Sequence, residues 1–433
     1  MGVARGKKTI VISGSNGKLL NMRRLLWVLS SLIVFTTFSV AQAPSPAQYL
    51  LDEAINTISE RYFGFAQIDD SALNRSANQK LELACKDITP CPFGVGEIVL
   101  DDVLSSIGDG HTFRLSAIAW AQFVANANNA PLPMMGLKFT ALPDASTLVV
   151  TRVLENSPAK SAGIQRGDTL WAVNGESLDQ YKSATEAINA ITTLEFNHEA
   201  IELEIQTRGS MTRKTVKLEP VALKPWLPSY ELRPDGVAII TFYQYLTGGL
   251  IASKVHEFVH QAQTSKARAI ILDVRGSGGG SGFESAASAG AFLEQAVGTR
   301  IESARGNSET IFQNGGINGT NFRIENPAYW SGELLVLSNH ISRSAAEYMT
   351  FFLQNAARAK VIGEPTAGVL NTSTSIYPLP GDSSLAVTSG RSSTLTGKPH
   401  PERVTPDIVM TDDMGALSQG RDVIFEKALE MLK

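Results

Sequence analysis

The sequence has few cysteines, no excess of charge of one sign and no low-complexity tract, and each absence excludes a class of protein. Only two of the 433 residues are cysteine, too few for a small disulfide-rich scaffold. Lysine and arginine total 38 against 42 aspartate and glutamate, so the basic excess of nucleic-acid-binding proteins is missing and no nucleic-acid partner is expected. The 43% of hydrophobic residues indicates a globular protein of two or three domains.

The N-terminal region has the pattern of a secretory signal peptide. Met22-Arg23-Arg24 precedes an apolar run from Leu25 to Val40, and Ala41-Gln42-Ala43 supplies the small residues of a cleavage site. The run is too short for a comfortable transmembrane span, so we expect cleavage after Ala43 and no stable membrane span afterwards. Residues 1–21 are then an upstream extension. We expect an exported protein, periplasmic or extracellular; an uncleaved N-terminal anchor is the alternative.

The two cysteines, Cys85 and Cys91, stand close together in the string ACKDITPCPF. In an exported protein such a pair indicates one disulfide bond. A metal site would need more ligands than this segment offers. Because the closed loop is short, the bridge should contribute about 2 kcal/mol, at the low end of the usual range.

Three regions follow the signal peptide of residues 1–43. Residues 44–115 are predicted to be mainly helical and contain the cysteine loop, and residues 130–222 form a β-rich unit. Residues 225–433 alternate strands and helices, which predicts a layered α/β core. The helical region ends in the turn Asp109-Gly110-His111-Thr112, a polar place to present a histidine that acts as a base near neutral pH.

The β-rich unit contains the string SPAKSAGIQRGDTLWAVNG, from Ser157 to Gly175, which closely resembles a PDZ domain. The resemblance implies a module that takes a peptide as an added strand and holds its C-terminal carboxylate in backbone amides. The carboxylate-binding loop would then comprise Met135, Gly136, Leu137 and Phe139. A PDZ fold used only as a spacer or lid is the alternative.

A serine stands where a strand turns into a helix in the segment from Leu334 to Gly368. The apolar start of this segment predicts a buried strand, and after a polar turn Ser344 begins an amphipathic helix. A serine at this place has an oxyanion donor beside it, the N–H of Ala345, and the helix dipole favours negative charge. The alternative is a structural cap, because Glu347 three residues on completes a capping box.

A glycine-rich run follows another strongly apolar predicted strand, Ala269–Val274. The run lacks the lysine of a P-loop and the spacing of a dinucleotide fingerprint, so phosphate binding is not favoured. A glycine cluster at the end of a buried strand can instead offer free N–H groups to an oxyanion, and Ser344 follows a strand of the same predicted sheet. The glycines predicted to take this part are Gly278, Gly279 and Gly280.

A rival motif, H-E-x-x-H, occurs at His256, Glu257 and His260 on a predicted helix. Two histidines at i and i+4 can share a zinc ion, as in zinc proteases. The expression is short and often matches by chance, both histidines are expected at the edge of the buried stripe, and no third ligand follows with a supporting turn. A surface helix is therefore favoured over a zinc protease.

Together the motifs DGHT, the PDZ-like string, LDVRGSGGG, SRSAAE, VIGEPTAG and ERVTPDI resemble, in kind and order, the tail-specific (C-terminal processing) serine peptidases. The resemblance implies an α/β fold: a crotonase-like (ClpP/crotonase) layered core, a helical N-terminal region and an inserted PDZ-like domain. It also implies an endopeptidase that cuts peptides or unfolded proteins near their C-termini without a metal or organic cofactor.

The family has two catalytic arrangements, and the sequence favours one of them. A Ser/Lys dyad would need lysine where Val369 stands, so that dyad is absent. The sequence resembles the tricorn-core branch, in which a histidine from the N-terminal part activates the serine. By this resemblance Ser344 is the nucleophile, His111 the general base and Glu402 the orienting glutamate.

One departure from that branch affects the base. The residue before the catalytic histidine is serine in the tricorn pattern, and here it is Gly110. Asp109, Thr112 or Glu402 must then orient His111. Because this partner is not fixed by the sequence, a catalytically inactive peptide-binding protein of the same fold remains the alternative function.

Overall fold

In the computed structural model, which describes residues 43–142 and 147–433, the core is a six-stranded sheet with helices on both faces. The predicted signal peptide lies outside the described residues, apart from Ala43. Strand β10 is antiparallel to β11 and the other neighbours are parallel. In spatial order the strands are β10 (Ser229–Leu232), β11 (Val237–Thr241), β12 (Ala269–Asp273), β16 (Glu333–Ser338), β17 (Lys360–Gly363) and β20 (Ile408–Val409).

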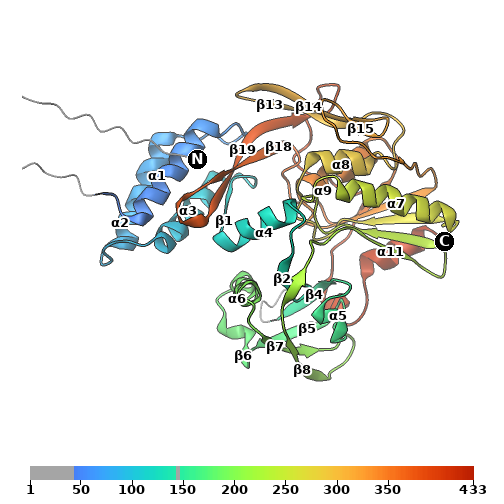
Figure 1. Ribbon diagram of the computed structural model, residues 1–433, viewed down its shortest axis with the longest axis horizontal. Coiled ribbons are helices and arrows are strands. Elements are labelled where there is room, and N and C mark those ends of the chain that lie inside the picture. Colours follow the sequence, from blue (N-terminus) through green and yellow to red (C-terminus); the bar gives the residue numbers. More distant parts are fainter. Residues whose placement is uncertain (1–42, 143–146) are drawn as a thin grey trace, which may run out of the picture. The chain divides into compact units, whose positions relative to one another are not determined.

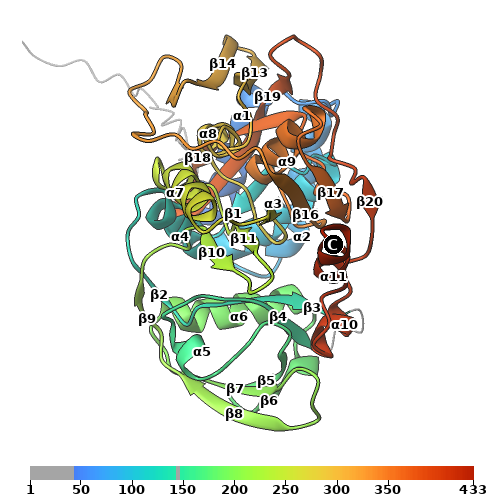
Figure 2. The same cartoon turned by 90° about the vertical axis from the view of Figure 1, so that its right-hand side faces the viewer.

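The two faces of this sheet are covered by different helices (Figure 2). Every residue of β12 is buried, as expected for a parallel strand packed on both sides. On one face lie α7 (Leu250–Thr264), α8 (Gly282–Ala289) and α9 (Ala345–Asn355), which share a core with β11, β12 and β16. On the other face α11 (Val423–Met431) packs its apolar side chains on the same strands. The layered α/β core predicted from the alternation of strands and helices is therefore confirmed.

A second sheet joins the N-terminal helices to the core (Figure 1). Strand β19 pairs with β1, β13 and β18, and its apolar residues pack against the helical region. The strands are β1 (Phe113–Leu115), β13 (Val297–Ser303), β14 (Gly306–Gln313), β15 (Gly316–Ile317), β18 (Thr372–Pro378) and β19 (Ser384–Ser393). The pattern of apolar residues does not predict the long hairpin of β13 and β14, because its outer residues are polar and exposed.

The N-terminal helices are α1 (Pro46–Arg61), α2 (Asp70–Cys85) and α3 (Phe93–Ile107), followed by α4 (Ala117–Ala127). Helix α1 buries Leu50, Ile55 and Ile58 against its neighbours. Tyr49, on the same helix, is 48% exposed. The predicted disulfide between Cys85 and Cys91 joins the end of α2 to the start of α3.

The PDZ-like unit has a sheet and a core of its own. Among the described strands, β3 lies at the edge of this sheet and pairs with β4 alone, so its other side can accept an added strand. The sheet comprises β3 (Leu137–Ala141), β4 (Leu148–Val153), β5 (Thr169–Val173), β6 (Glu176–Ser177), β7 (Ile201–Gln206) and β8 (Arg213–Leu218). Its helices are α5 (Pro158–Ser161), a 3-10 turn (Leu178–Gln180) and α6 (Ala184–Phe196).

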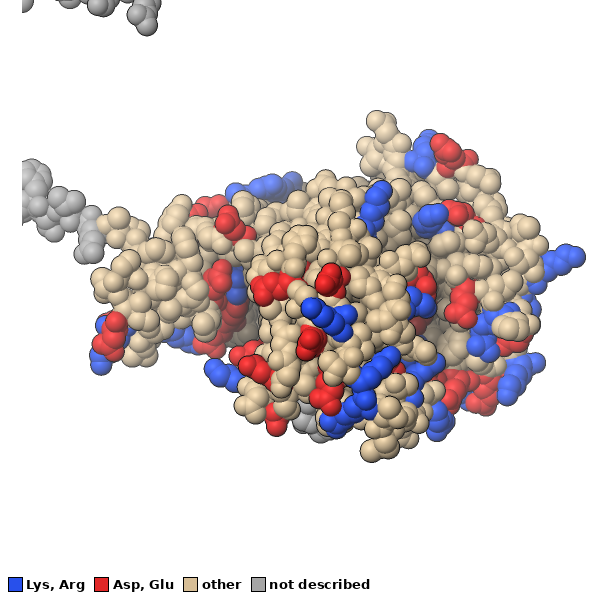
Figure 3. All heavy atoms as spheres, turned by 60° about the horizontal axis from the view of Figure 1, so that its bottom comes forward, with Lys and Arg blue, Asp and Glu red and all other residues tan. Residues whose placement is uncertain are grey.

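Short elements complete the described chain. Strands β2 (Leu132–Met134) and β9 (Val221–Leu223) pair where the chain enters and leaves the PDZ-like unit. A 3-10 turn (Pro380–Asp382) connects β18 to β19, and α10 (Met414–Ser418) precedes α11. Within residues 43–142 and 147–433, no helix has the length and apolarity needed to cross a bilayer. Lysine and arginine alternate with aspartate and glutamate over the face drawn in Figure 3.

A buried ion-pair network ties the PDZ-like unit to the core sheet. Asp273, at the end of β12, pairs with Arg152 of β4 (3.0 Å) and with Arg275 (2.9 Å). Asp422, which caps α11, pairs with Arg275 (2.8 Å) and with Arg166 of the PDZ-like unit (2.9 Å). Burial alone would raise the pKa of Asp273, but the guanidinium groups of Arg152 and Arg275 lower it to about 2.

We predict that Asp273→Asn lowers the free energy of unfolding by about 3–5 kcal/mol, because it leaves buried guanidinium groups without their carboxylate. Chemical denaturation would measure the loss. The exposed pair Arg233–Asp235 supplies the control, and Asp235→Asn should cost at most about 1 kcal/mol. Since the pKa of Asp273 is depressed, its contribution is complete above about pH 4 and disappears as the pH falls towards 2. Equal losses in both variants would show that the network does not stabilise the fold.

Candidate active site

Ser344 occupies a strained turn between β16 and α9. Its backbone has φ +53° and ψ −113°, a region that residues other than glycine rarely adopt and that costs about 1–3 kcal/mol. The serine stands at the N-terminus of α9, and its side chain faces a cleft. Such strain is typical of a residue whose side chain must stand clear of the sheet for chemistry.

The carboxylate of Glu347 holds this turn in place through hydrogen bonds. Glu347 is fully buried and accepts hydrogen bonds from the N–H of Ser344 (2.8 Å) and from the Thr366 hydroxyl (2.7 Å). It also accepts from the N–H groups of Gly368 (2.9 Å) and Val369 (3.2 Å). The capping interaction anticipated from the sequence is therefore one part of a larger site that joins the serine turn to the loop after β17.

The predicted oxyanion glycines lie beside the serine. A Cβ atom built on Gly279, whose φ is +90°, would come within 2.8 Å of the Ser344 Cβ and 3.2 Å of the Ala345 nitrogen. Only glycine fits there. Among the described residues, none accepts a hydrogen bond from the N–H of Gly278, Gly279 or Ala345. These amides therefore have the free donors that an oxyanion hole needs.

The start of the glycine run is clamped by both domains. Arg152 of the PDZ-like unit donates to the carbonyl of Arg275 (2.9 Å), and the N–H of Gly276 donates to Asn339 Oδ1 (3.0 Å). Arg343, the residue before the serine, donates through its N–H to the carbonyl of Ser277 (3.0 Å). The loop is thus held at both ends before it reaches Gly278.

His111 is held from its own turn and from β18. Asp109 Oδ1 accepts from the backbone N–H of His111 (2.8 Å), and Thr374 donates its hydroxyl to the His111 carbonyl (3.0 Å). The Arg343 guanidinium bonds the carbonyl of Gly110, so the turn that carries His111 is tied to the residue before Ser344. Asp109 therefore positions the backbone of His111 and does not contact its ring.

The ring of His111 is oriented by Thr372, which the sequence analysis missed. His111 Nδ1 lies 2.8 Å from Thr372 Oγ1, and the Thr372 hydroxyl donates to the carbonyl of Val369 (3.4 Å). The hydroxyl therefore accepts the proton of Nδ1, and Nε2 is left as the basic nitrogen. No local pattern marks Thr372, because it lies 261 residues from the histidine. The only signal was Gly110, which lacks the hydroxyl that the family pattern places there.

The imidazole of His111 is neutral over the physiological pH range. Burial, and next the charge of Arg343, lower the pKa of His111 to about 3, while Asp109 opposes this shift. The side chain is only 2% exposed. A neutral imidazole is the form that can accept a proton from a serine hydroxyl.

Ser344, His111 and the glycine run all line one cleft of about 1200 Å³. Most of its wall is apolar and comes from the segment after His111, from α4 and from β18. The large apolar residues in this wall are Leu104, Phe113, Leu115, Phe123, Leu246 and Ile376. Such a cleft can take an extended peptide with apolar side chains.

The PDZ-like unit supplies Lys138 to the same cleft. Burial, and next the neighbouring Arg152, lower the pKa of Lys138 to about 8. Its ammonium group lies 3.4 Å from the carbonyl of Tyr243 and 5.5 Å from the centre of the Trp226 ring. Unlike His111, Lys138 therefore titrates close to neutral pH, and it lines the same cleft as Ser344.

Glu402 lies away from the His111 ring in the described structure. Its carboxylate is exposed and pairs with Arg403 (2.6 Å), while its backbone carbonyl accepts from the N–H of Leu370 (2.9 Å). The expected contact between Glu402 and His111 is absent, and Thr372 takes that place. Glu402 contacts the loop that leads to Thr372 only through its backbone carbonyl. Its predicted role in orienting His111 therefore remains a prediction without a supporting contact.

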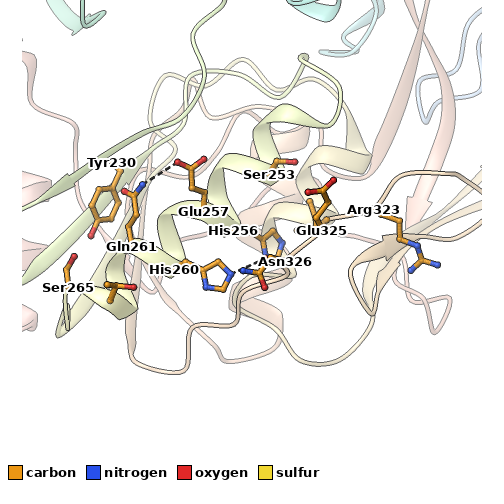
Figure 4. A pocket seen from close by; sticks show the side chains of 12 residues that line it. Tyr230, Ser253, His256, Glu257, His260, Gln261, Ser265, Arg323, Glu325 and Asn326 are labelled. Atoms are coloured by element: carbon orange, nitrogen blue, oxygen red, sulfur yellow. Dashed lines mark hydrogen bonds between the residues drawn. The ribbon is translucent and has the colours of Figure 1, made fainter.

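The H-E-x-x-H motif lies in a different hollow, on α7 (Figure 4). Contrary to the expected edge position, His256 is buried, with 1% exposed. Its Nδ1 accepts from the N–H of Ala328 (2.9 Å) and its Nε2 donates to the carbonyl of Ala287 (3.1 Å), so neither nitrogen is available to a metal. His260 contacts the carbonyl of Asn326. The described residues contain no group of three or more His, Cys, Asp or Glu side chains able to hold a metal ion.

Models of known protein families match two segments of the chain. The model of peptidase family S41 matches residues 236–410, and that of the PDZ domain matches residues 149–197. Residues 236–410 form a peptidase family S41 domain. The S41 domain carries Ser344 and the glycine run, so the predicted resemblance to tail-specific serine peptidases is confirmed.

Two curated relatives and a solved structure agree with the S41 domain. Carboxyl-terminal-processing peptidase 3 of Arabidopsis thaliana is 28% identical over 62% of this chain and 51% of the relative, so the chain spans about half the length of that relative. A carboxyl-terminal-processing protease of Synechocystis sp. is 25% identical over 69% of this chain and 68% of the relative. The structure of a photosystem II D1 C-terminal processing protease covers 84% of this chain and 93% of that chain with a TM-score of 0.50 and 18% identity, a likeness of fold.

We predict that Thr372→Val lowers kcat/KM by about 10- to 100-fold, because the Nδ1 proton loses its acceptor and the ring loses its orientation. Hydrolysis of a labelled peptide would measure the effect. Thr372→Ser keeps the hydroxyl and should retain most of the activity. If serine and valine variants were equally impaired, the hydroxyl would have no part in orienting His111.

The lowered pKa of His111 predicts the pH profile. Because the imidazole is protonated only near pH 3, kcat/KM should stay level between pH 8 and pH 5. An unperturbed histidine of pKa about 6.5 would lose roughly 30-fold over the same range. The pH dependence of kcat/KM, measured with a short peptide amide, distinguishes these cases. A fall in kcat/KM with an apparent pKa near 6.5 would contradict the effect of burial on His111, and one with an apparent pKa near 8 would point to Lys138.

Proposed function

We propose that this protein is a serine endopeptidase that cuts peptides or unfolded proteins near their C-termini. The observation that carries the proposal is the convergence, in one cleft, of Ser344 on its strained turn, His111 with a free Nε2, and the unbonded amides around Gly279. These are the three parts that acyl transfer requires: nucleophile, base and oxyanion donors.

The proposed reaction gives each of these groups one step, although no hydrogen bond joins Ser344 to His111 among the described residues. Ser344 Oγ attacks the peptide carbonyl while His111 Nε2 takes its proton. The oxyanion is held by the N–H of Ala345 and by an N–H from Gly278, Gly279 or Gly280, where the loss of one donor typically costs about 10²–10³ in rate. His111 then gives the proton to the leaving amine, and water releases the acyl group from Ser344. Thr372 keeps the imidazole in the tautomer that these steps need.

The PDZ-like unit is proposed to deliver the substrate. The free edge of β3 and the loop of Met135, Gly136, Leu137 and Phe139 would take the peptide end, while Lys138 on the same strand borders the cleft with Ser344. We further propose that the α/β core is crotonase-like and that the mature protein begins after Ala43 and is exported. The curated relatives are named as processing proteases, which supports the peptide as substrate.

We predict that residues 44–433 hydrolyse casein and that Ser344→Ala and His111→Ala each abolish detectable turnover. Lys138→Met should retain activity, because it removes the cleft lysine whose pKa lies near 8 without touching the proposed base. Chelator should have no effect, and neither should His260→Ala. Full activity of Ser344→Ala would refute the proposal. No cleavage by wild type, with casein-derived peptides still bound, would favour the inactive binding protein.

A further inference from the structure

The PDZ-like unit places a carboxylate of its own in the loop expected to bind a peptide carboxylate. Glu195 is the penultimate residue of α6, and the backbone N–H of Met135 donates to its Oε1. The neighbouring N–H of Gly136 also favours the ionised form of this carboxylate and lowers its pKa. These two amides belong to the loop that precedes β3, which is the part of a PDZ module that holds a terminal carboxylate.

The conformation of this loop leaves its N–H groups without a backbone acceptor among the described residues. Gly136 has φ +85°, and a Cβ on it would lie 2.3 Å from the Ser157 Cβ, so the loop is pressed against the start of α5. Its carbonyls are used on that side: the Met135 carbonyl accepts from Ala159 (3.0 Å) and the Gly136 carbonyl from Leu154 (2.9 Å). The N–H groups point the other way, where the carboxylate of Glu195 meets them.

The surface beside this loop offers a strand edge and apolar side chains to a peptide. Strand β3 has a free edge, and the apolar side chains of Leu137 and Phe139 on β3 and of Ile188 and Leu194 on α6 are only partly buried against the domain core. An extended peptide on this edge would end at the loop with an apolar last residue and a carboxylate at the amides of Met135 and Gly136. Glu195 occupies that terminal position.

We propose that Glu195 is an internal competitor that closes the carboxylate pocket of the PDZ-like unit, and that a peptide ending in a free apolar residue binds only by displacing it. The proposal rests on the proposed role of this unit in binding peptide ends. The hydrogen bonds formed by the incoming carboxylate replace equivalent bonds to Glu195, so this exchange adds little to the free energy of peptide binding. Selectivity among peptides then comes from the apolar side chains beside the loop.

The environment of Glu195 favours its release. Burial raises the pKa of Glu195 to about 7, against the opposing effect of the Met135 and Gly136 amides. The ionised carboxylate of Glu195 is therefore partly desolvated at the loop, and it becomes hydrated again when it leaves. A substrate carboxylate that enters brings its own charge-assisted hydrogen bonds and the burial of its last side chain.

The test is binding, measured in residues 44–433, which form one compact unit, with Ser344→Ala present so that no peptide is cut. The probes are fluorescein-labelled nine-residue peptides ending in alanine, valine or leucine, each with a free carboxylate or a terminal amide. Fluorescence anisotropy gives Kd for the parent, for Glu195→Ala and for Glu195→Gln. Glu199→Ala is the matched control, since Glu199 is an exposed carboxylate just after the same helix.

If Glu195 fills the pocket in nine molecules of ten, its removal should tighten the binding of free-carboxylate peptides about tenfold. Glu195→Gln keeps an acceptor without the charge and should fall between parent and alanine variant. The amidated peptides and the Glu199→Ala control should show no change. Unchanged or weaker binding of every free-carboxylate peptide to Glu195→Ala, or no binding at all, would overturn the proposal, provided that thermal melting shows a folded variant.

The outcome is independent of catalysis. Casein cleavage by the protein with Ser344 intact decides the proposed peptidase function, and peptide binding in the Ser344→Ala background decides the role of Glu195. A protein that does not cut but binds more tightly after Glu195→Ala would keep the second proposal and lose the first. A protein that cuts while Glu195→Ala leaves Kd unchanged would do the reverse.

Discussion

The buried carboxylate of Glu347 is the contact on which the proposed site depends. Each hydrogen bond to a charged group contributes about 1.5–3 kcal/mol, and Glu347 accepts such bonds from Ser344, Thr366, Gly368 and Val369. These bonds offset part of the burial that raises the pKa of Glu347, and they hold the Ser344 backbone in a conformation that costs about 1–3 kcal/mol. Because Val369 also accepts from the hydroxyl that orients His111, one carboxylate sets the nucleophile and, through one further residue, the base.

The proposed base, His111, is buried and lies near the positive charge of Arg343. Burial and Arg343 both disfavour a proton on His111, so the ring waits as neutral imidazole. An imidazolium formed during reaction would be stabilised chiefly by the oxyanion that forms with it, since Thr372 offers a hydroxyl and not a carboxylate. The attraction between imidazolium and oxyanion in the transition state is therefore more important here than in a catalytic triad whose third member is a carboxylate.

The sequence predicts the parts of this protein whose signals are local, and misses those that depend on distant contacts. The apolar runs of β12 and β16, the PDZ-like string and the serine at a strand–helix junction follow from neighbouring residues. The hairpin of β13 and β14 does not, because its polar strands are half exposed. His256 was expected at the edge of the buried stripe of its helix, but it is fully buried and accepts a hydrogen bond from the N–H of Ala328. Thr372 and Glu195 act through contacts with residues 261 and 60 positions away, which no periodicity encodes.

The ion pairs of Arg152 and Arg166 have a consequence for where a substrate is cut. They attach the PDZ-like unit to the strand end from which the glycine run starts, and Arg152 also holds the carbonyl of Arg275. A peptide end docked on β3 would then lie at a fixed distance from Ser344. Under the proposed function, the number of residues removed from a substrate is set by the distance between the loop before β3, which holds the peptide end, and Ser344. The side chains between these two points would not change that number.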